Sequence, residues 1–399
     1  MNRDTWCFRP GGRCRESAVG RLLGLLTVCV VVLSCGLATA EARDELRGVY
    51  LELHNNVAFG ALPVVADRDW PRLCRELKKL GVNAIFPSVV SATGSAYPSA
   101  VVSPLSWSEL QGQTNLLKII LAAAHAEGLE VHPLTVLWYK APKNTDPDRL
   151  VHTVSGETTN TLCPSVAGNR DLMRRMLLEL ATDFDIDGIH YDYVRFPDGG
   201  YCYCRHCRAG FEKVIKAPVT AWPKDVLYGG KFEKRYQEYL YGVISSFVRE
   251  MYPLLKQLKP QLVVSAAVWA KESGSRVPGV WQDWGEWARS GWVDFLSFMN
   301  YSLYILQHYD EFARNEAKQI VGKRSLVYAL GSVVDSPEGL VNAVRLGREL
   351  KGDGFIVYTL TTSTYSEHLP ELHRTVWSVP ATVPRFGRNK GDMSLQSGK

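Results

Sequence analysis

The segment Asp187-Gly-Ile-His-Tyr-Asp-Tyr-Val-Arg-Phe-Pro197 has the composition of a buried parallel strand, except that charged and imidazole side chains interrupt it. A strand inside a parallel sheet is usually apolar on both faces, because helices cover both sides. Since side chains alternate between the two faces, His190 and Asp192 share one face, whereas Ile189, Tyr191 and Tyr193 take the other. We therefore expect the polar pair to point into a cavity or a barrel mouth.

Seven further apolar runs accompany this one, with segments of helical periodicity between them. One such segment carries Trp70, Leu73 and Leu77 and ends before Gly81, a residue type that often follows a helix. The eight runs span residues 48–54, 82–89, 129–138, 188–196, 262–269, 293–301, 326–331 and 354–360. Eight strand-helix units in one chain predict an α/β fold of the (β/α)8 barrel type over residues 41–377.

The composition is that of a globular protein with one large core. The chain has 399 residues, of which 46% are hydrophobic and 22% are charged, and its formal net charge is +5. This moderate charge gives no indication of nucleic-acid binding. The sequence also lacks a phosphate-binding loop, a His-Glu-x-x-His zinc helix and a Gly-x-Ser-x-Gly nucleophile elbow. Neither a nucleotide-dependent enzyme nor a serine hydrolase is therefore expected.

Residues 1–40 have the features of a secretory signal peptide. An arginine-bearing start precedes the apolar run 22–37, and Ala38-Thr39-Ala40 provides a small-x-small cleavage site. An alternative remains open, because Val32-Leu33-Ser34-Cys35 resembles a bacterial lipoprotein box, in which Cys35 would carry a lipid anchor. Both alternatives predict an extracytoplasmic protein, either periplasmic or secreted and either soluble or tethered to the membrane.

Two segments depart from the regular repeat of strands and helices. Residues 231–258 contain no strand of their own and predict an extended helix after the fourth strand, preceded by a long loop over 198–224. From residue 378 to residue 399 the chain is rich in Pro, Gly, Ser, Arg and Lys without periodicity, which predicts a mobile tail.

A cysteine group lies in the long loop after the fourth strand. Cys202, Cys204 and Cys207 form a Cys-x-Cys-x-x-Cys pattern, and Cys163 follows the third strand on the adjacent loop. Four thiolates can bind tetrahedral zinc, which would brace the loops rather than take part in catalysis. In an extracytoplasmic protein, a disulfide between Cys163 and one of the other three is the competing hypothesis. We expect no cofactor to be required for the chemistry itself.

Ionisable and aromatic residues follow the predicted strands at their carboxyl ends, where barrel enzymes carry their active sites. Carboxylates, imidazoles and aromatic rings therefore converge on one rim. The residues are Glu52 and His54 on the first strand, His132 and Trp138 on the third, His190, Asp192 and Arg195 on the fourth, Trp269 and Glu272 after the fifth, Tyr301 after the sixth and Asp335 after the seventh.

Several short motifs together resemble the glycoside-hydrolase-like family 10 barrels, over roughly Glu45 to Leu360. They are Arg47-Gly48-Val49-Tyr50, Val131-His132, Leu162-Cys163-Pro164-Ser165, the segment 187–197, Asp283-Trp284 and Met299-Asn300-Tyr301. The resemblance implies a (β/α)8 fold and an action on glycans, with bacterial cell-wall polysaccharide among the substrates proposed for the family.

The fourth strand is more distantly similar to that of family 18 chitinases, whose motif is Asp-Gly-x-Asp-x-Asp-x-Glu. In this chain Asp192 matches the last Asp, His190 takes an Asp position and Val194 stands where the chitinases have their acid-base Glu. Met299-x-Tyr301 matches their inward Met-x-Tyr. The missing Glu argues against a substrate-assisted chitinase mechanism.

Cleavage of a glycosidic bond needs a protonated carboxyl beside the leaving oxygen and an ionised carboxylate that attacks the sugar or activates water. We assign Asp192 to one role, with Glu52 and Glu272 as the leading partners and Asp335 behind them. His190 could hold Asp192 by a hydrogen bond, and Arg195 could keep it ionised. The alternative is that Asp192 only forms a buried salt bridge with Arg195.

The remaining rim residues are expected to bind the substrate, because flat rings stack on sugar faces and polar tips bond hydroxyl groups. They are His54, His132, Trp138, His190, Arg195, Trp269 and Tyr301. The sequence thus predicts a secreted glycoside hydrolase acting on a polysaccharide or oligosaccharide. A catalytically inactive glycan-binding barrel is the alternative, since a fold alone does not establish activity.

Overall fold

The computed structural model describes residues 42–53, 69–106, 112–196 and 200–386. The predicted signal peptide with Cys35, the residue His54 and the end of the predicted tail lie outside these residues. Within them, no helix combines the length and the apolar character needed to cross a membrane.

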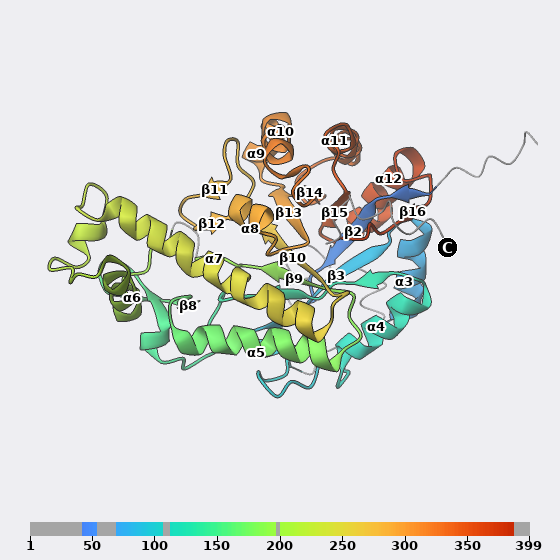
Figure 1. Ribbon diagram of the computed structural model, residues 1–399. Coiled ribbons are helices and arrows are strands. Elements are labelled where there is room, and N and C mark those ends of the chain that lie inside the picture. Colours follow the sequence, from blue (N-terminus) through green and yellow to red (C-terminus); the bar gives the residue numbers. More distant parts are fainter. Residues whose placement is uncertain (1–41, 54–68, 107–111, 197–199, 387–399) are drawn as a thin grey trace, which may run out of the picture. The chain divides into compact units, whose positions relative to one another are not determined.

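Eight parallel strands, one of them divided into two pieces, close into a barrel, which confirms the predicted (β/α)8 fold (Figure 1). Closure follows from the pairing of β2 with both β15 and β3. In barrel order the strands are β2 (Leu46–Leu51), β3 (Ala84–Ser91), β5 (Glu130–Val131) with β6 (Leu134–Val136), β9 (Gly188–Asp192), β10 (Val263–Val268), β13 (Phe295–Asn300), β14 (Ser325–Gly331) and β15 (Gly354–Tyr358).

The third barrel strand is divided into β5 and β6. Pro133 lies between the two pieces and has no backbone N–H to donate to the ladder. Both pieces still pair in parallel with β3, so the interruption leaves the barrel closed.

Helices cover the outside of the barrel between successive strands (Figure 1). The two longest, α5 and α7, run alongside each other, and α7 confirms the extended helix predicted over 231–258. The helices are α3 (Trp70–Lys79), α4 (Leu116–Ala126), α5 (Ala167–Asp183), α6 (Arg205–Ile215), α7 (Glu233–Leu258), α8 (Trp284–Ser290), α9 (Leu303–Gln307), α10 (Tyr309–Ile320), α11 (Pro337–Glu349) and α12 (Leu369–Thr375).

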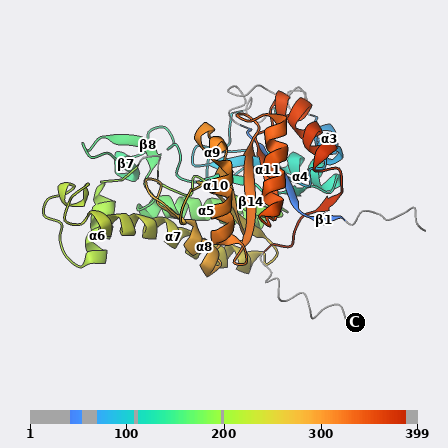
Figure 2. The same ribbon diagram turned by 90° about the horizontal axis from the view of Figure 1, so that it is seen from above.

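Short elements elaborate the loops between the barrel strands. In both views the hairpin of β7 and β8 lies next to α6 at one end of the molecule (Figures 1 and 2). These elements are η1 (Pro147–Arg149), β7 (Leu150–His152), β8 (Thr158–Leu162), η2 (Lys224–Val226), β11 (Arg276–Val277), β12 (Gln282–Asp283), β4 (Gly94–Ser95) and η3 (Thr364–His368).

The tail prediction is wrong for residues 378–386. Strand β16 (Ala381–Thr382) pairs in parallel with β1 (Arg43–Asp44), and Phe386 is buried with its ring centroid 4.7 Å from that of Phe295 in the barrel interior. Backbone pairing and burial of one aromatic ring hold this segment, although its composition has no periodicity.

Two apolar cores result from the alternation of side chains along the barrel strands. The larger core lies between the strands and the helices and includes Ile189 and Tyr191. The smaller core fills the barrel itself and contains Leu46, Tyr50, Ala84, Phe86, Leu134, Phe295, Val327, Ala329, Ile356 and Phe386. Because the barrel is packed in this way, a ligand can reach only its ends.

Gly188 allows β9 to pack closely against the neighbouring strands. A Cβ at this position would lie 2.1 Å from Nδ1 of His132 and 2.9 Å from the carbonyl oxygen of Val263. We therefore expect Gly188→Ala to lower the free energy of unfolding by about 1–3 kcal/mol, because the packed interior must shift. Urea denaturation of both proteins measures this difference.

Gly168→Ala in α5 is the matched control, because a Cβ there meets no atom within 4 Å. Alanine is the better helix former, so we expect this variant to be unchanged or more stable by up to about 1 kcal/mol. Equal unfolding midpoints for wild type and Gly188→Ala would contradict the packing described here.

Candidate active site

The polar face of β9 points into the barrel, as its sequence predicts. His190 contacts side chains of β2 and β10 inside the barrel, whereas Ile189 and Tyr191 pack in the core under the helices. Asp192, two residues further along the same face, ends the strand at the carboxyl side of the barrel. The alternation therefore carries one carboxylate to the barrel mouth.

His190 forms a buried polar network beneath the mouth. Its Nε2 lies 2.8 Å from Oη of Tyr50, and its Nδ1 lies 2.8 Å from Oγ of Ser265. Tyr50 Oη is also 3.2 Å from Oγ of Ser297. Burial, helped by the nearby His132, lowers the pKa of His190 to about 3, so the ring is neutral at physiological pH. The network fixes the position of the Tyr50 ring below the mouth.

Asp192 is partly exposed at the mouth, with 20% of its side chain accessible. Its Oδ1 accepts a hydrogen bond of 2.7 Å from the backbone N–H of Tyr193 and lies 3.9 Å from Nη1 of Arg195. Both neighbours favour the ionised carboxylate. The distance to Arg195 exceeds a hydrogen bond, so this pair is looser than the locked salt bridge that the sequence left as an alternative.

Glu52 is the second carboxyl group at the mouth. It directly follows β2, and its side chain is half-buried. Burial raises the pKa of Glu52 to about 7, and the negative charge of Asp192 contributes to this rise. Glu52 therefore keeps its proton up to a pH of about 7, well above the range in which a free glutamate loses it.

Stacked tyrosines line the mouth beside the two carboxyl groups. The rings of Tyr301 and Tyr358 stack with centroids 4.5 Å apart, and Tyr50 contacts Tyr358 edge-on at 5.8 Å. Burial raises the pKa of both Tyr301 and Tyr358, and Asp192 adds to the effect. Their hydroxyl groups therefore stay protonated and can donate hydrogen bonds.

A second group of flat side chains lies where β9 and β10 end. The Arg195 guanidinium lies 4.0 Å from the ring centroid of Tyr193 and 5.7 Å from that of Trp269. Tyr193 in turn stacks on Tyr139 at 4.1 Å. Trp269 and Tyr139 are exposed by 37% and 36%, so their rings can meet a ligand.

Three residues predicted to bind substrate are fully buried, and we correct their assignments. Trp138 packs edge-on against Phe247 of α7 at 4.9 Å, because its backbone φ of +56° turns the chain away from the mouth. His132 lies inside the barrel, where its Nε2 is 2.9 Å from Glu130. His190 belongs to the network below Tyr50 and cannot touch a substrate.

The other two candidates for the second carboxylate are placed less favourably than Glu52. Glu272 has 47% of its side chain exposed, and its Oε1 lies 3.5 Å from Nζ of Lys271. Asp335 accepts a 2.8 Å hydrogen bond from the backbone N–H of Ser336 in the turn before α11. Glu272 is therefore exposed to solvent beside a lysine, and Asp335 is hydrogen-bonded within a turn.

Sequence reasoning missed four aromatic residues of the mouth. Tyr50 and Tyr358 lie on barrel strands, and the alternation of side chains along those strands could have identified them as pointing inward. Tyr139 follows its strand in irregular backbone, so no periodic signal marked it. The alternation placed Tyr193 on the outer face with Ile189 and Tyr191, which is wrong, because a φ of +51° turns the backbone there and its ring stacks on Tyr139.

The four cysteines of the predicted cluster come together in the loops next to the mouth. Sγ of Cys163 lies 3.6 Å from Sγ of Cys207 and 3.7 Å from Sγ of Cys204. All four sulfur atoms, with that of Cys202, lie within 4.8 Å of one another and are buried. These residues are the candidates for holding a metal ion.

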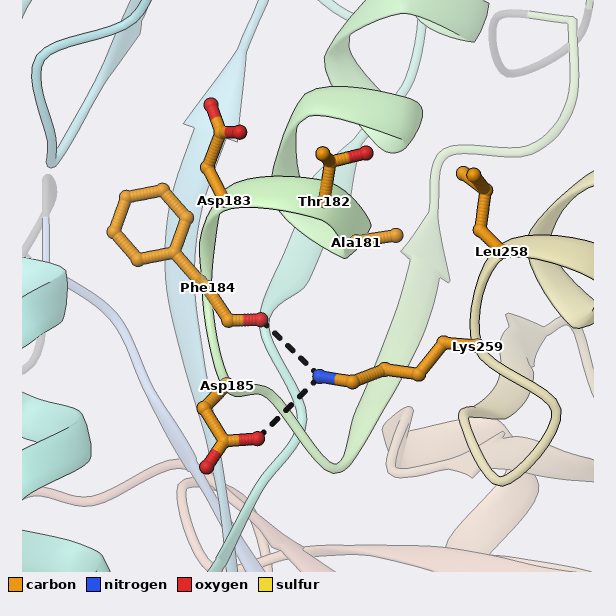
Figure 3. A pocket seen from close by; sticks show the side chains of 7 residues that line it. All are labelled: Ala181, Thr182, Asp183, Phe184, Asp185, Leu258 and Lys259. Carbon is orange, nitrogen blue, oxygen red and sulfur yellow. Dashed lines mark hydrogen bonds and ion pairs between the residues drawn. The ribbon is translucent and has the colours of Figure 1, made fainter.

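A surface pocket at the opposite end of the barrel differs from the mouth (Figure 3). It lies just before β9, and the ammonium of Lys259 reaches across it to the carbonyl oxygen of Phe184 and to Asp185, at 3.2 and 3.5 Å. The ammonium group of Lys259 is thus already hydrogen-bonded within the protein. Glu52 and Asp192 do not line this pocket.

The sequence matches one protein family over most of its length. The sequence model of the family described as glycosyl hydrolase-like 10 matches residues 45–332. Glycosyl hydrolase YngK of Bacillus subtilis (strain 168) is 24% identical over 205 residues, which cover 46% of this chain and 40% of that protein. The chain thus aligns with less than half of this relative. The family match confirms the resemblance indicated by the motifs and supports a function of the glycosidase type.

Solved structures of glycosidases share the fold. The PgaB (BpsB) glycoside hydrolase domain from Bordetella bronchiseptica is similar with a TM-score of 0.65 and 14% identity, over 84% of this chain and 99% of that one. Alpha-L-fucosidase isoenzyme 2 from Paenibacillus thiaminolyticus is similar with a TM-score of 0.59 and 15% identity, over 83% of this chain and 49% of that one. At such identities the likeness shows the barrel alone.

The raised pKa of Glu52 predicts a stability effect with a defined sign. Its folded pKa of about 7 exceeds the ordinary value of 4.5, so the folded state binds the extra proton between these values. The stability that Glu52 contributes at low pH is therefore lost as the pH rises through 7. Glu52→Gln avoids the charge, and we expect it to be more stable than wild type at pH 8 by about 1–3 kcal/mol.

Denaturation at pH 8 and at pH 4.5 measures this effect, because the advantage of the variant should vanish at the lower pH. Glu272→Gln, at an exposed carboxyl group, serves as the control and should show the same small difference at both values. An advantage of Glu52→Gln that does not change with pH would contradict the raised pKa.

Proposed function

The chain belongs to the glycosyl hydrolase-like 10 family, and we propose that it is a glycoside hydrolase that cleaves O-glycosidic bonds in a polysaccharide. The observation that carries the proposal is the pair Glu52 and Asp192 at the barrel mouth. Burial and the charge of Asp192 raise the pKa of Glu52 to about 7. Acid-base cleavage of a glycoside requires two carboxyl groups in different environments, so that one is protonated while the other is ionised.

Glu52 acts as the general acid in this proposal. Because it keeps its proton up to a pH of about 7, it can give that proton to the oxygen of the leaving sugar as the glycosidic bond breaks. Asp192 remains ionised beside the Tyr193 N–H and Arg195. It either attacks the anomeric carbon or takes a proton from a water molecule that does so.

The aromatic residues of the mouth position the sugar. Tyr301, Tyr358 and Trp269 offer flat surfaces to the apolar faces of pyranose rings, and the tyrosine hydroxyls donate hydrogen bonds. Arg195, held over the ring of Tyr193, keeps its positive charge near Asp192 and orients that carboxylate. His54, which lies outside the described residues, stays a sequence-based candidate for the same surface.

A cell-wall polysaccharide is the substrate class that we propose. The signal peptide predicted over residues 1–40 supports this choice, since it would carry the enzyme outside the cytoplasm, either free or tethered through Cys35. The mass of the mature amino terminus distinguishes cleavage after Ala40 from a lipidated Cys35.

The residue at position 194 bears on the alternative of an inactive glycan-binding barrel. Val194 replaces the chitinase Glu, yet its side chain is fully buried in the core under the helices. The left-handed backbone at Tyr193 shifts the alternation after Asp192, so position 194 does not face the mouth. Val194 therefore does not line the mouth, and we place the general acid at Glu52, directly after the first barrel strand, instead.

We expect wild-type protein to release new reducing ends from one of a panel of polysaccharides that includes peptidoglycan, chitin and xylan. Glu52→Gln and Asp192→Asn should each lower this rate by about 10²–10⁴-fold, since each removes one proton-transfer or charged group. The activity of wild type should fall as the pH rises through 7, because Glu52 then loses its proton.

Glu272→Gln is the control and should retain wild-type activity, since its carboxyl group is exposed to solvent. Equal activity in wild type and Asp192→Asn would exclude Asp192 as a catalytic residue. Calorimetric binding of a glycan by wild type, without any new reducing ends, would support the binding barrel instead.

A further inference from the structure

Two loops at the barrel mouth meet through four cysteines that the proposed chemistry does not use. Cys163 follows the β7–β8 hairpin, whereas Cys202, Cys204 and Cys207 lie before and inside the first turn of α6. Each cysteine is at most 1% exposed. Cys163 and Cys207 are separated by 44 positions in the sequence, so only the fold brings the group together.

The distances between the sulfur atoms fit one metal ion. Cys163 Sγ lies 3.6 Å from Cys207 Sγ and 3.7 Å from Cys204 Sγ. A tetrahedral ion with metal-sulfur bonds of about 2.3 Å places its four sulfur ligands about 3.8 Å apart. A disulfide would instead bring two of them to about 2.05 Å. Cys163, Cys204 and Cys207 thus have the spacing of thiolates around a shared centre, and all four sulfur atoms lie within 4.8 Å of one another.

Hydrogen-bond donors surround the sulfur atoms, as buried negative charge requires. The backbone N–H of Cys207 points at Sγ of Cys204, and that of His152 points at Sγ of Cys202, both at 3.4 Å. Cys204 also caps the amino terminus of the 11-residue helix α6, where the helix dipole favours anions.

From this geometry we propose that Cys163, Cys202, Cys204 and Cys207 bind a structural zinc ion that clamps the hairpin of β7 and β8 to α6. Four protein thiolates complete the tetrahedral coordination of zinc and leave no position open for a substrate. The ion thus has a bracing role, separate from the carboxyl groups at the mouth.

The clamp fixes the chain that leaves β9. The backbone N–H of Tyr203 donates to the carbonyl oxygen of His152 at 3.0 Å, and the hydroxyl of Tyr236 on α7 donates to that of Cys202. Two residues before Cys202, the N–H of Gly200 donates to the carbonyl oxygen of Gly279 at 3.0 Å. These contacts hold the described residues around Cys202, which lies ten positions after Asp192 in the sequence.

Elemental analysis of the purified full chain, prepared without chelators, tests the proposal. We expect about one zinc ion per chain, and X-ray absorption should show four sulfur ligands at about 2.3 Å. Cys204→Ser should lose most of the zinc. Cys74→Ala is the matched control, because Cys74 is a buried cysteine of α3 outside the cluster, and it should keep the zinc.

Limited trypsin digestion tests the bracing role in wild-type protein, so that the result does not depend on the folding of a variant. After zinc is removed by a chelator, we expect new cleavage sites between residues 139 and 232, where the loops carry several lysines and arginines. Added zinc should reverse the effect. These readouts need no substrate, so they succeed or fail independently of the glycosidase proposal.

Three outcomes would overturn the inference. Zinc-free protein with disulfides among the four cysteines would show that they are oxidised. Bound iron in place of zinc would refute the identity of the ion. An unchanged tryptic pattern after complete removal of zinc would refute the clamp.

Discussion

Two carboxyl groups share one partly buried barrel mouth, and this constraint sets the chemistry of the whole site. Burial alone disfavours a charge on Glu52, and the charge of Asp192 disfavours it further, so the pKa of Glu52 rises to about 7. The backbone N–H of Tyr193 and the guanidinium of Arg195 stabilise the charge on Asp192 instead. Up to a pH of about 7 the proton thus stays on Glu52, and a protonated carboxyl group beside a carboxylate is the state that glycoside cleavage needs.

The barrel makes this arrangement possible because its interior is filled below the mouth. Tyr50, His190 and Ser297 form a hydrogen-bonded layer between the apolar interior and the carboxyl groups. Burial keeps His190 neutral, so no positive charge from below offsets the repulsion between Glu52 and Asp192. The same packing requires Gly188, since any larger residue would meet the ring of His132.

The sequence predicted the features that depend on local periodicity. All eight barrel strands were found, and the alternation within β9 placed His190 and Asp192 on the inner face.

The predictions failed where the backbone departs from regular geometry. Trp138 and Tyr193 have positive φ angles, so their side chains do not point where a regular strand would place them. The choice of Glu52 over Glu272 depends on the burial of Glu52 near the charge of Asp192 and on the exposure of Glu272, which no sequence spacing encodes. The segment 378–386 is held by pairing with residues more than 300 positions earlier.

Titration of Glu52 by carbon-13 NMR of its side-chain carboxyl group tests the central claim most directly, with the resonance assigned by its loss in Glu52→Gln. The account predicts a midpoint near 7 in wild type and a lower midpoint in Asp192→Asn, because the variant lacks the neighbouring negative charge. The exposed Asp183→Asn should leave the midpoint unchanged. A midpoint near the ordinary 4.5 in wild type, or one that Asp192→Asn does not shift, would contradict the coupling between the two groups.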